Sequence, residues 1–249
     1  MHFIEVSKNE GIATLILCRG KVNALTGEVV DQLKQALSNI EKDPDIRALI
    51  LTGKGTFFSF GFDVPEFLSY SKDEFSDYLK KFTGLLAYIF LYPKPIVAAL
   101  NGHTIAGGCM LSLACDQRVM SAGRARISLN EISFGSSVLA GSTEMLRACV
   151  GNSNALEILY SGAMYSAEQA QKIGLVDHVA QEQDLVETSK KITAELGEKS
   201  SAAFTSIKLL LRKPIAKEFE KKEEDAIKEF VDIWYSKATW ENLKKILIK

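Results

Sequence analysis

An apolar segment that runs into a turn of small residues, and then into a second apolar segment, constrains the fold of this chain most strongly. Residues 95–100 (PIVAAL) favour a buried strand, and Asn101-Gly102 follows them. Ala106-Gly107-Gly108 then precedes the run MLSLAC, which favours a helix. A helix that begins at these glycines presents unpaired backbone N–H groups, and its dipole favours negative charge there. The segment therefore predicts a strand–turn–helix unit that could stabilise an oxyanion on a bound carbonyl.

Glu131 follows in Ser-Leu-Asn-Glu-Ile as a lone acid in a mostly apolar stretch. A carboxylate beside an oxyanion site is suited to proton transfer next to a carbonyl group. The alternative is that the glycines serve only close packing and that Glu131 is a surface acid, because short glycine motifs often match by chance.

Strand and helix patterns alternate through the first half of the chain. Residues 12–17 (IATLIL) and 46–51 (IRALIL) predict buried strands, and helical spacing between Val30 and Ile40 predicts a helix that Pro44 stops. A second amphipathic helix is predicted over residues 75–89. This alternation predicts an α/β fold with stacked layers around one core.

Beyond about Gly141 the pattern becomes mostly helical. Ser166 and Gln169 have the spacing of a capping box, which marks the start of a helix. The last strand predicted before this helical part lies around residues 118–120. From Ser201 onward we expect a charged helix that buries Phe230, Ile233 and Trp234.

Composition limits the classes of partner. The 249 residues carry a formal net charge of −1, so neither nucleic acid nor an anionic membrane is expected as the main partner. The four cysteines include no CxxC pair and the three histidines are scattered, so we expect reduced cysteines and no metal site. No secretory leader, membrane-spanning run or peroxisomal C-terminal tripeptide is recognised, and the expected location is cytoplasmic.

Three ordered motifs resemble one enzyme family. They are Phe58-Ser59-Phe60-Gly61-Phe62-Asp63, then Lys94 to Ala99 with Asn101-Gly102, and then Gly107-Gly108-Cys109 with Ala114-Cys115-Asp116. Together they resemble the crotonase superfamily, also called the enoyl-CoA hydratase/isomerase superfamily, over nearly the whole chain. The resemblance implies an α/β fold that is a crotonase-like spiral of ββα units, with a C-terminal helical trimerisation region. We expect a spiral core at residues 1–195, a helical region at residues 196–249, and a homotrimer or hexamer.

The resemblance also implies a catalytic site. The backbone N–H groups of Phe62 and Gly107 match the family's oxyanion hole, and Glu131 matches the second of two catalytic glutamates in the hydratases. Met110 stands where hydratases carry the first, and a thioether neither donates nor accepts a useful proton. Burial should raise the pKa of Glu131, which suits a base that must return its proton.

One carboxylate favours double-bond migration over hydration. Moving a double bond from C3–C4 to C2–C3 removes a proton from C2 and returns one to C4, which a single group can do. Ala106-Gly107-Gly108-Cys109 with Leu129-Asn130-Glu131 also resembles monofunctional Δ3,Δ2-enoyl-CoA isomerases more than hydratases. The alternatives are a hydratase or CoA-thioester hydrolase of the same superfamily, and a non-catalytic acyl-CoA or partner-binding protein.

The substrate-binding residues are likewise implied by the resemblance. An acyl-CoA thioester is the expected partner, with coenzyme A as part of the substrate and no separate cofactor. Lys21, Asn23 and Ala24 match the loop along the CoA moiety, and Asp63 and Val64 match residues at its adenine end. Gly61 precedes the first oxyanion donor, and we expect Phe60, Met110 and Leu129 to line an apolar pocket.

Overall fold

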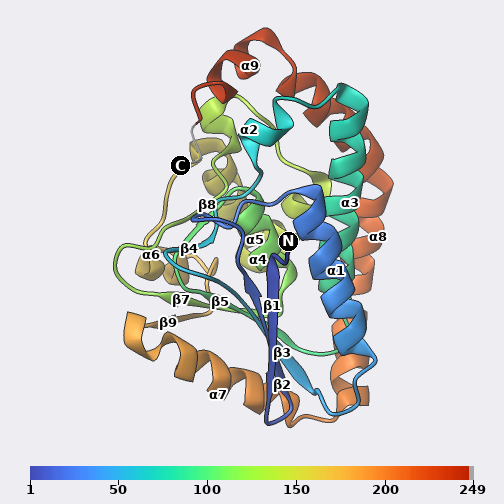
Figure 1. The fold of residues 1–249 in the computed structure, drawn as a ribbon, viewed down its shortest axis with the longest axis vertical. Helices are drawn as coiled ribbons and strands as arrows, with labels where there is room; N and C mark the ends of the chain where they lie inside the picture. The colour runs from blue at the N-terminus through green and yellow to red at the C-terminus, as the bar shows by residue number, and fades with distance from the viewer. Residues whose placement is uncertain (247–249) are drawn as a thin grey trace.

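Two sheets organise the computed structural model, which describes residues 1–246 of the chain (Figure 1). Within these residues, the larger sheet has the strand order β1-β2-β3-β5-β7-β9, and the smaller has the order β4-β6-β8. β1 and β2 are antiparallel, whereas every other neighbouring pair is parallel. The strands are β1 (Ile4–Asn9), β2 (Ile12–Leu17), β3 (Ala48–Gly53), β4 (Phe57–Ser59), β5 (Ile96–Leu100), β6 (His103–Ile105), β7 (Gln117–Ser121), β8 (Ile127–Ser128) and β9 (His178–Ala180).

The chain repeats a strand–strand–helix unit, which confirms the predicted spiral. In each unit the first strand joins the larger sheet and the second joins the smaller one, as in β3-β4, β5-β6 and β7-β8. These three pairs are followed by α2 and α3, by α4, and by η1 and α5, respectively. The helices are α1 (Gly27–Glu41), α2 (Val64–Phe67), α3 (Lys72–Phe90), α4 (Gly107–Ala114), η1 (Glu131–Phe134), α5 (Ala140–Ser161), α6 (Ala167–Lys172), η2 (Glu182–Asp184), α7 (Leu185–Gly197), α8 (Ser201–Trp234) and α9 (Lys237–Leu243).

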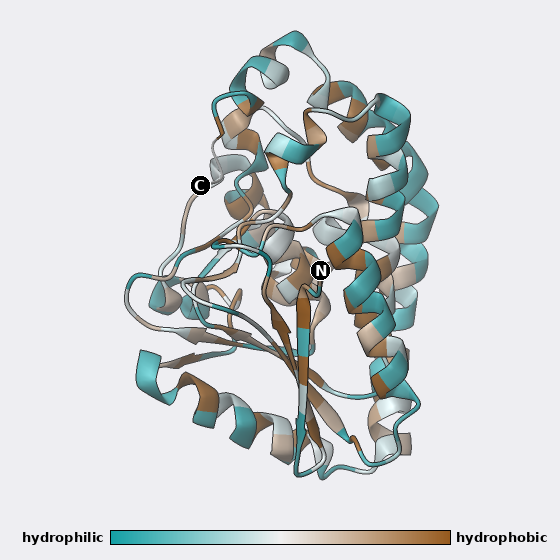
Figure 2. Ribbon diagram, viewed as in Figure 1, coloured by the Kyte–Doolittle hydropathy of each residue, from teal (hydrophilic) through white to brown (hydrophobic). Residues whose placement is uncertain are grey.

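Local sequence signals account for most element boundaries. The strands at residues 12–17 and 96–100 occur as predicted, and the capping box at Ser166 and Gln169 is formed. β3 begins at Ala48, two residues later than the apolar run suggested, because the Ile46 N–H bonds to the Asp43 carbonyl in the preceding turn. The central strands are strongly apolar, while α1 and α7 turn polar faces to solvent (Figure 2).

α8 runs along the outside of the core and contacts both α3 and α5. Phe230 and Trp234 are buried as predicted, whereas Ile233 is only half-buried. No helix among residues 1–246 combines the length and the apolar character needed to cross a membrane. The C-terminal tripeptide considered for targeting lies outside the described residues.

Candidate active site

A small apolar cavity of about 250 Å³ lies between the end of β6, η1 and the C-terminal end of α8. Its wall combines residues from the glycine turns, from η1 and from the C-terminal helices, so segments distant in sequence meet there. Apolar and aromatic side chains dominate the wall, as is usual for small-molecule sites. The lining residues are Phe60, Phe62, Val64, Ile105, Ala106, Asn130, Glu131, Ser133, Phe134, Met164, Phe230, Trp234 and Ile246.

Glu131 is the only carboxylate among the described residues of this wall. It is the first residue of η1, its side chain is buried, and neither carboxylate oxygen has a hydrogen-bond partner within residues 1–246. Burial raises its pKa to about 8, because desolvation penalises the charged form and no cation offsets it. An unpaired buried carboxyl is costly to keep, which is typical of a group held for function.

Phe62 is held by the backbone on both of its sides. The Leu25 N–H donates to the Gly61 carbonyl at 2.7 Å, and the Asp63 N–H donates to the Leu25 carbonyl at 3.3 Å. This is a parallel bridge between Leu25 and Phe62, so the N–H of Phe62 itself points away from Leu25. The amide is therefore available to a ligand on the side opposite Leu25.

Gly107 opens α4, and the turn before it is strained. Ala106 adopts φ 50° and ψ −118°, a backbone conformation that residues with a Cβ rarely adopt. A Cβ atom at Gly61 would lie 2.9 Å from the Gly107 nitrogen, so the segments carrying the two predicted donors approach closely. Gly61 also has φ +98°, and glycine is therefore required there by both conformation and space.

The predicted CoA-loop residues have mixed surroundings. The Asn23 amide donates to the carbonyls of Lys54 (3.0 Å) and Phe57 (2.9 Å), and its side-chain oxygen is buried without a partner among the described residues. Ala24 is buried, and Lys21 is exposed to solvent. Asn23 therefore ties neighbouring loops together, and Lys21 is accessible to an anionic ligand.

Four further predicted residues divide into two pairs. Phe60 and Val64 line the cavity beside Phe62. Met110 and Leu129 are buried and are not among the described residues that line this cavity, and their role in the acyl pocket stays a prediction. Met110 lies in α4, every residue of which is buried.

Several residues of the site were not found from sequence. Arg19 forms an ion pair with Asp63 at 2.5 Å, and Asp63 also caps α2, so this carboxylate is engaged in the structure itself. Phe134, Phe230 and Trp234 form much of the cavity wall. The helical spacing of Phe230 and Trp234 predicted their burial, but no local pattern indicated that they would face Glu131.

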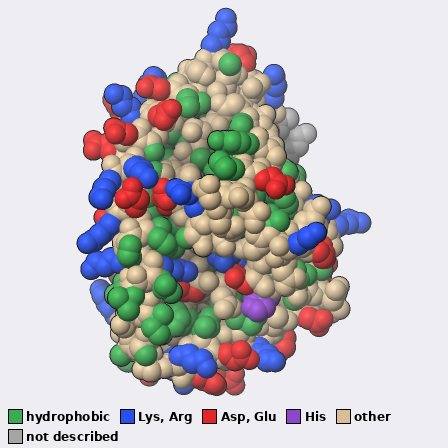
Figure 3. Space-filling view, turned by 180° about the vertical axis from the view of Figure 1, so that it is seen from behind, with side chains coloured by type: hydrophobic (Ala, Val, Ile, Leu, Met, Phe, Trp, Pro, Cys, Tyr) green, Lys and Arg blue, Asp and Glu red, His purple; other side chains and the backbone are tan. Residues whose placement is uncertain are grey.

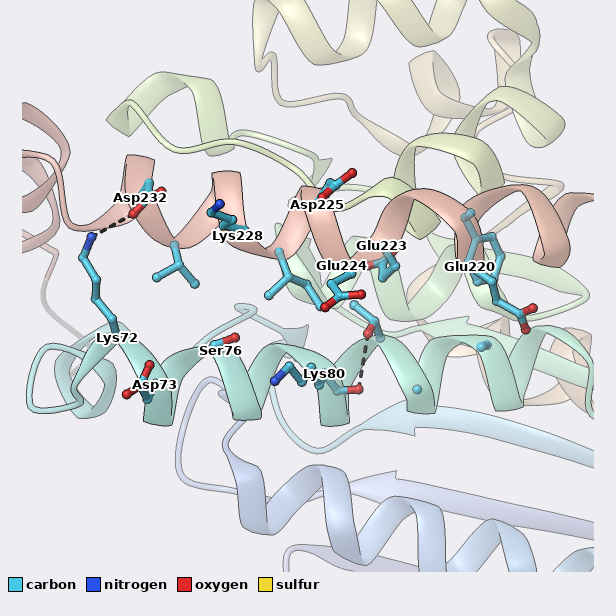
Figure 4. A pocket seen from close by; sticks show the side chains of 16 residues that line it. Lys72, Asp73, Ser76, Lys80, Glu220, Glu223, Glu224, Asp225, Lys228 and Asp232 are labelled. Atoms are coloured by element: carbon cyan, nitrogen blue, oxygen red, sulfur yellow. Dashed lines mark hydrogen bonds and ion pairs between the residues drawn. The ribbon is translucent and has the colours of Figure 1, made fainter.

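A larger groove of about 900 Å³ lies between α3 and α8 (Figure 4). Its rim carries charges of both signs, including Lys72, Lys80 and Asp232. Glu223 in this groove accepts a hydrogen bond from the Gly141 N–H at 2.8 Å, at the first turn of α5. Burial raises the Glu223 pKa to about 7. Among the described residues, none that lines this groove also lines the cavity or belongs to the turns at Gly61 and Gly107.

Comparisons with known proteins agree with this fold. The enoyl-CoA hydratase/isomerase family model matches residues 7–244. A probable enoyl-CoA hydratase of Bacillus subtilis is 31% identical over 100% of this chain and 97% of its own length. The mitochondrial enoyl-CoA hydratase of Pongo abelii is 36% identical over 79% of this chain and 71% of its own. Human mitochondrial delta3-delta2-enoyl-CoA isomerase superposes with a TM-score of 0.92 at 26% identity, covering 98% of this chain and 96% of that one.

The two sheets and their repeated ββα units define the crotonase fold. The chain belongs to the enoyl-CoA hydratase/isomerase family, whose members act on acyl-CoA thioesters. The relatives include proteins named as hydratases and proteins named as isomerases, so the reaction must be argued from the site.

Proposed function

We propose that this protein is an enoyl-CoA isomerase that moves a double bond from the 3-position to the 2-position of an acyl-CoA thioester. The observation that carries the proposal is the carboxyl of Glu131 in an apolar cavity next to the Phe62 and Gly107 turns. Within residues 1–246 it is the one carboxyl in the cavity wall, and it has no hydrogen-bond partner. The superposition with a delta3-delta2-enoyl-CoA isomerase along almost the whole chain supports it.

In the proposed reaction, the ionised Glu131 removes a proton from C2 of the 3-enoyl thioester. The electron pair of the broken C–H bond forms a C1=C2 double bond, the carbonyl π electrons move to the oxygen, and the N–H groups of Phe62 and Gly107 stabilise the charge on this enolate oxygen. The enolate then collapses, the double bond forms between C2 and C3, and C4 takes the proton back from Glu131. The carboxylate is regenerated, so one group completes the cycle.

The rest of the site fits this chemistry better than hydration. Hydration requires a water molecule to be activated and a proton to be delivered, and two carboxylates perform these tasks well. Met110 stands where hydratases of the family carry the first of their two catalytic glutamates, and the wall around Glu131 is mainly apolar. An apolar wall disfavours an activated water and favours an acyl chain.

Ultraviolet absorbance tests the proposal directly, because conjugation of the double bond with the thioester changes the absorption. We expect the protein to convert 3-enoyl-CoA to 2-enoyl-CoA and to hydrate 2-enoyl-CoA slowly or not at all. Rapid hydration of 2-enoyl-CoA with no action on 3-enoyl-CoA would overturn the assignment in favour of a hydratase. Release of free thiol from a saturated acyl-CoA would favour a hydrolase.

The CoA part of the substrate is proposed to lie along the loop of Lys21, Asn23 and Ala24. Lys21 supports this because its ammonium group is exposed and is not in an ion pair with any described residue. Replacing Lys21 by Ala should raise KM for the thioester and leave kcat almost unchanged, because this contact is the same in the ground and transition states.

We also propose that the chain assembles as a homotrimer or hexamer through its C-terminal helices. Ile207, Leu210 and Leu211 on α8 are exposed by 58%, 74% and 67%, which is unusual for three large apolar side chains so close in sequence. Figure 3 shows hydrophobic side chains gathered where the first part of α8 reaches the surface. Light scattering should give the mass of three or six chains, and a monomer at micromolar concentration would contradict the proposal.

A further inference from the structure

The Leu25 carbonyl, which holds the Phe62 segment in place, accepts a second hydrogen bond. The hydroxyl of Tyr78 in α3 donates to it at 3.2 Å, beside the bond from the Asp63 N–H at 3.3 Å. The same Leu25 residue donates to the Gly61 carbonyl at 2.7 Å. The Leu25 N–H holds the Gly61–Phe62 peptide, which carries the Phe62 N–H, and Tyr78 in turn fixes Leu25 through its carbonyl.

Tyr78 also contacts Phe62 through its ring. The two ring centroids are 5.2 Å apart with planes at 84°, an edge-to-face arrangement that aromatic pairs prefer. Phe82 and Phe230 approach the same Phe62 ring at 5.0 and 6.4 Å. Tyr78 is the member of this cluster that holds both the side chain of Phe62 and the backbone bridge beside it.

We infer that Tyr78 is a positioning residue that aims the Phe62 N–H at the thioester oxygen. The inference rests on the proposed oxyanion function and extends it to a residue that is absent from the cavity wall and so touches no substrate. An oxyanion donor contributes most when charge develops in the transition state, and its contribution depends on alignment. Loss of the Tyr78 hydroxyl should therefore lower kcat more than it changes KM.

Tyr92 provides a matched control. It is as deeply buried as Tyr78, and its hydroxyl also donates to a backbone carbonyl, that of Leu37 in α1, at 2.8 Å. Neither Tyr92 nor Leu37 lines the cavity. Removing either hydroxyl leaves a buried carbonyl with one partner fewer, so both changes should destabilise the fold to a similar extent. Only the Tyr78 change should also affect catalysis.

The test compares Tyr78→Phe and Tyr92→Phe with the unaltered protein, using 3-enoyl-CoA and 2-enoyl-CoA as substrates. For Tyr78→Phe we expect kcat to fall about tenfold with KM within twofold, a smaller loss than the 10²–10³-fold of removing a whole donor. For Tyr92→Phe we expect both constants to stay within twofold. Hydrogen exchange of the peptide that contains residues 61–63 should accelerate in Tyr78→Phe only.

Equal kcat values for the two variants, or unchanged exchange at residues 61–63, would overturn the role of Tyr78 while leaving the proposed function intact. If the unaltered protein hydrates 2-enoyl-CoA instead of isomerising, the proposed reaction fails. The comparison of variants in hydration still decides the positioning role, because that reaction also passes through an enolate oxygen. Inactivity of the unaltered protein on both thioesters would overturn the proposed function and the inference together.

Discussion

Two buried glutamates of this molecule have similar pKa shifts and different surroundings. Burial raises the pKa of Glu131 to about 8 and that of Glu223 to about 7. Glu131 lies in the apolar cavity without a partner for either oxygen among the described residues. Glu223 lies in the charged groove between α3 and α8 (Figure 4). One of its oxygens accepts a hydrogen bond from the Gly141 N–H at the start of α5.

The difference teaches that a raised pKa does not by itself identify a catalytic base. Glu223 compensates an unpaired N–H at a helix N-terminus, where Leu139, the N-cap residue of α5, provides no side-chain cap. The carboxyl of Glu131 accepts no hydrogen bond from any described residue and lies beside the two glycine turns. The groups around each carboxyl, rather than its proton affinity, separate a structural acid from a functional one.

The largest expected difference between the two sites is in activity. Glu131→Gln retains the side-chain shape but cannot take a proton, so isomerase activity should fall by about 10²–10⁴-fold, the usual contribution of a positioned acid or base. Glu223→Gln is the matched control and should retain activity within twofold. Steady-state rates with 3-enoyl-CoA measure both, and an active Glu131→Gln protein would show that another group transfers the proton.

The Glu131→Gln change should raise the stability of the protein although it lowers the activity. Between its unfolded pKa of 4.5 and its folded pKa of about 8, Glu131 keeps in the folded state a proton that the unfolded state has lost. Its contribution to stability therefore decreases as pH rises through this window. Glu131→Gln removes this penalty and should stabilise the protein by on the order of 3 kcal/mol at pH 7.

Urea unfolding of the unaltered and Glu131→Gln proteins at several pH values checks this prediction. The two stabilities should be similar near pH 4.5, diverge as pH rises and reach a constant difference above pH 8. A difference that does not depend on pH would show that Glu131 does not retain its proton in the folded state.

The walls of the cavity and of the groove can be compared through two phenylalanines, Phe230 and Phe219. Both are buried on α8, but Phe230 lines the cavity and Phe219 lines the groove. Phe230→Leu enlarges the acyl cavity and should shift kcat/KM toward longer acyl chains by about tenfold, the scale of one methylene in an apolar pocket. Phe219→Leu should leave the chain-length preference unchanged. A panel of 3-enoyl-CoA substrates measures both variants, and equal shifts would place the acyl chain outside this cavity.

The smallest expected effect concerns the cap on α5. At pH 4, where the raised pKa keeps Glu223 protonated and the burial penalty on its charged form is not felt, Glu223→Ala removes only the acceptor of the Gly141 N–H and should lower the free energy of unfolding by about 1 kcal/mol, as the loss of other N-terminal caps does. Activity should stay within twofold. Thermal unfolding gives the stability change. A large loss of activity in a folded protein would mean that the groove takes part in function and that the two sites are coupled.

Sequence reasoning predicted the elements more reliably than the cavity. The strand at residues 96–100 and the glycine turn after it were readable because apolar runs and turn residues act over a few neighbours. The burial of Met110 and Leu129 away from the described cavity wall could not be read from local sequence, because burial is decided by distant segments. Arg19 was missed for the same reason, since its partners Asp63 and Glu66 are remote in sequence.

Local sequence patterns were enough to predict the alternation of strands and helices and the glycine turn at Gly107, and the sequence also shows the acid at Glu131 and the thioether at Met110. Only the tertiary structure decided that Phe230 and Trp234 of α8 close the cavity over Glu131, and that Leu25 and Tyr78 hold the Phe62 segment. The difference arises from how far apart in the sequence the interacting residues lie. Strand, turn and helix preferences arise from neighbouring residues, whereas desolvation of a carboxyl and alignment of an amide depend on every segment that packs around them.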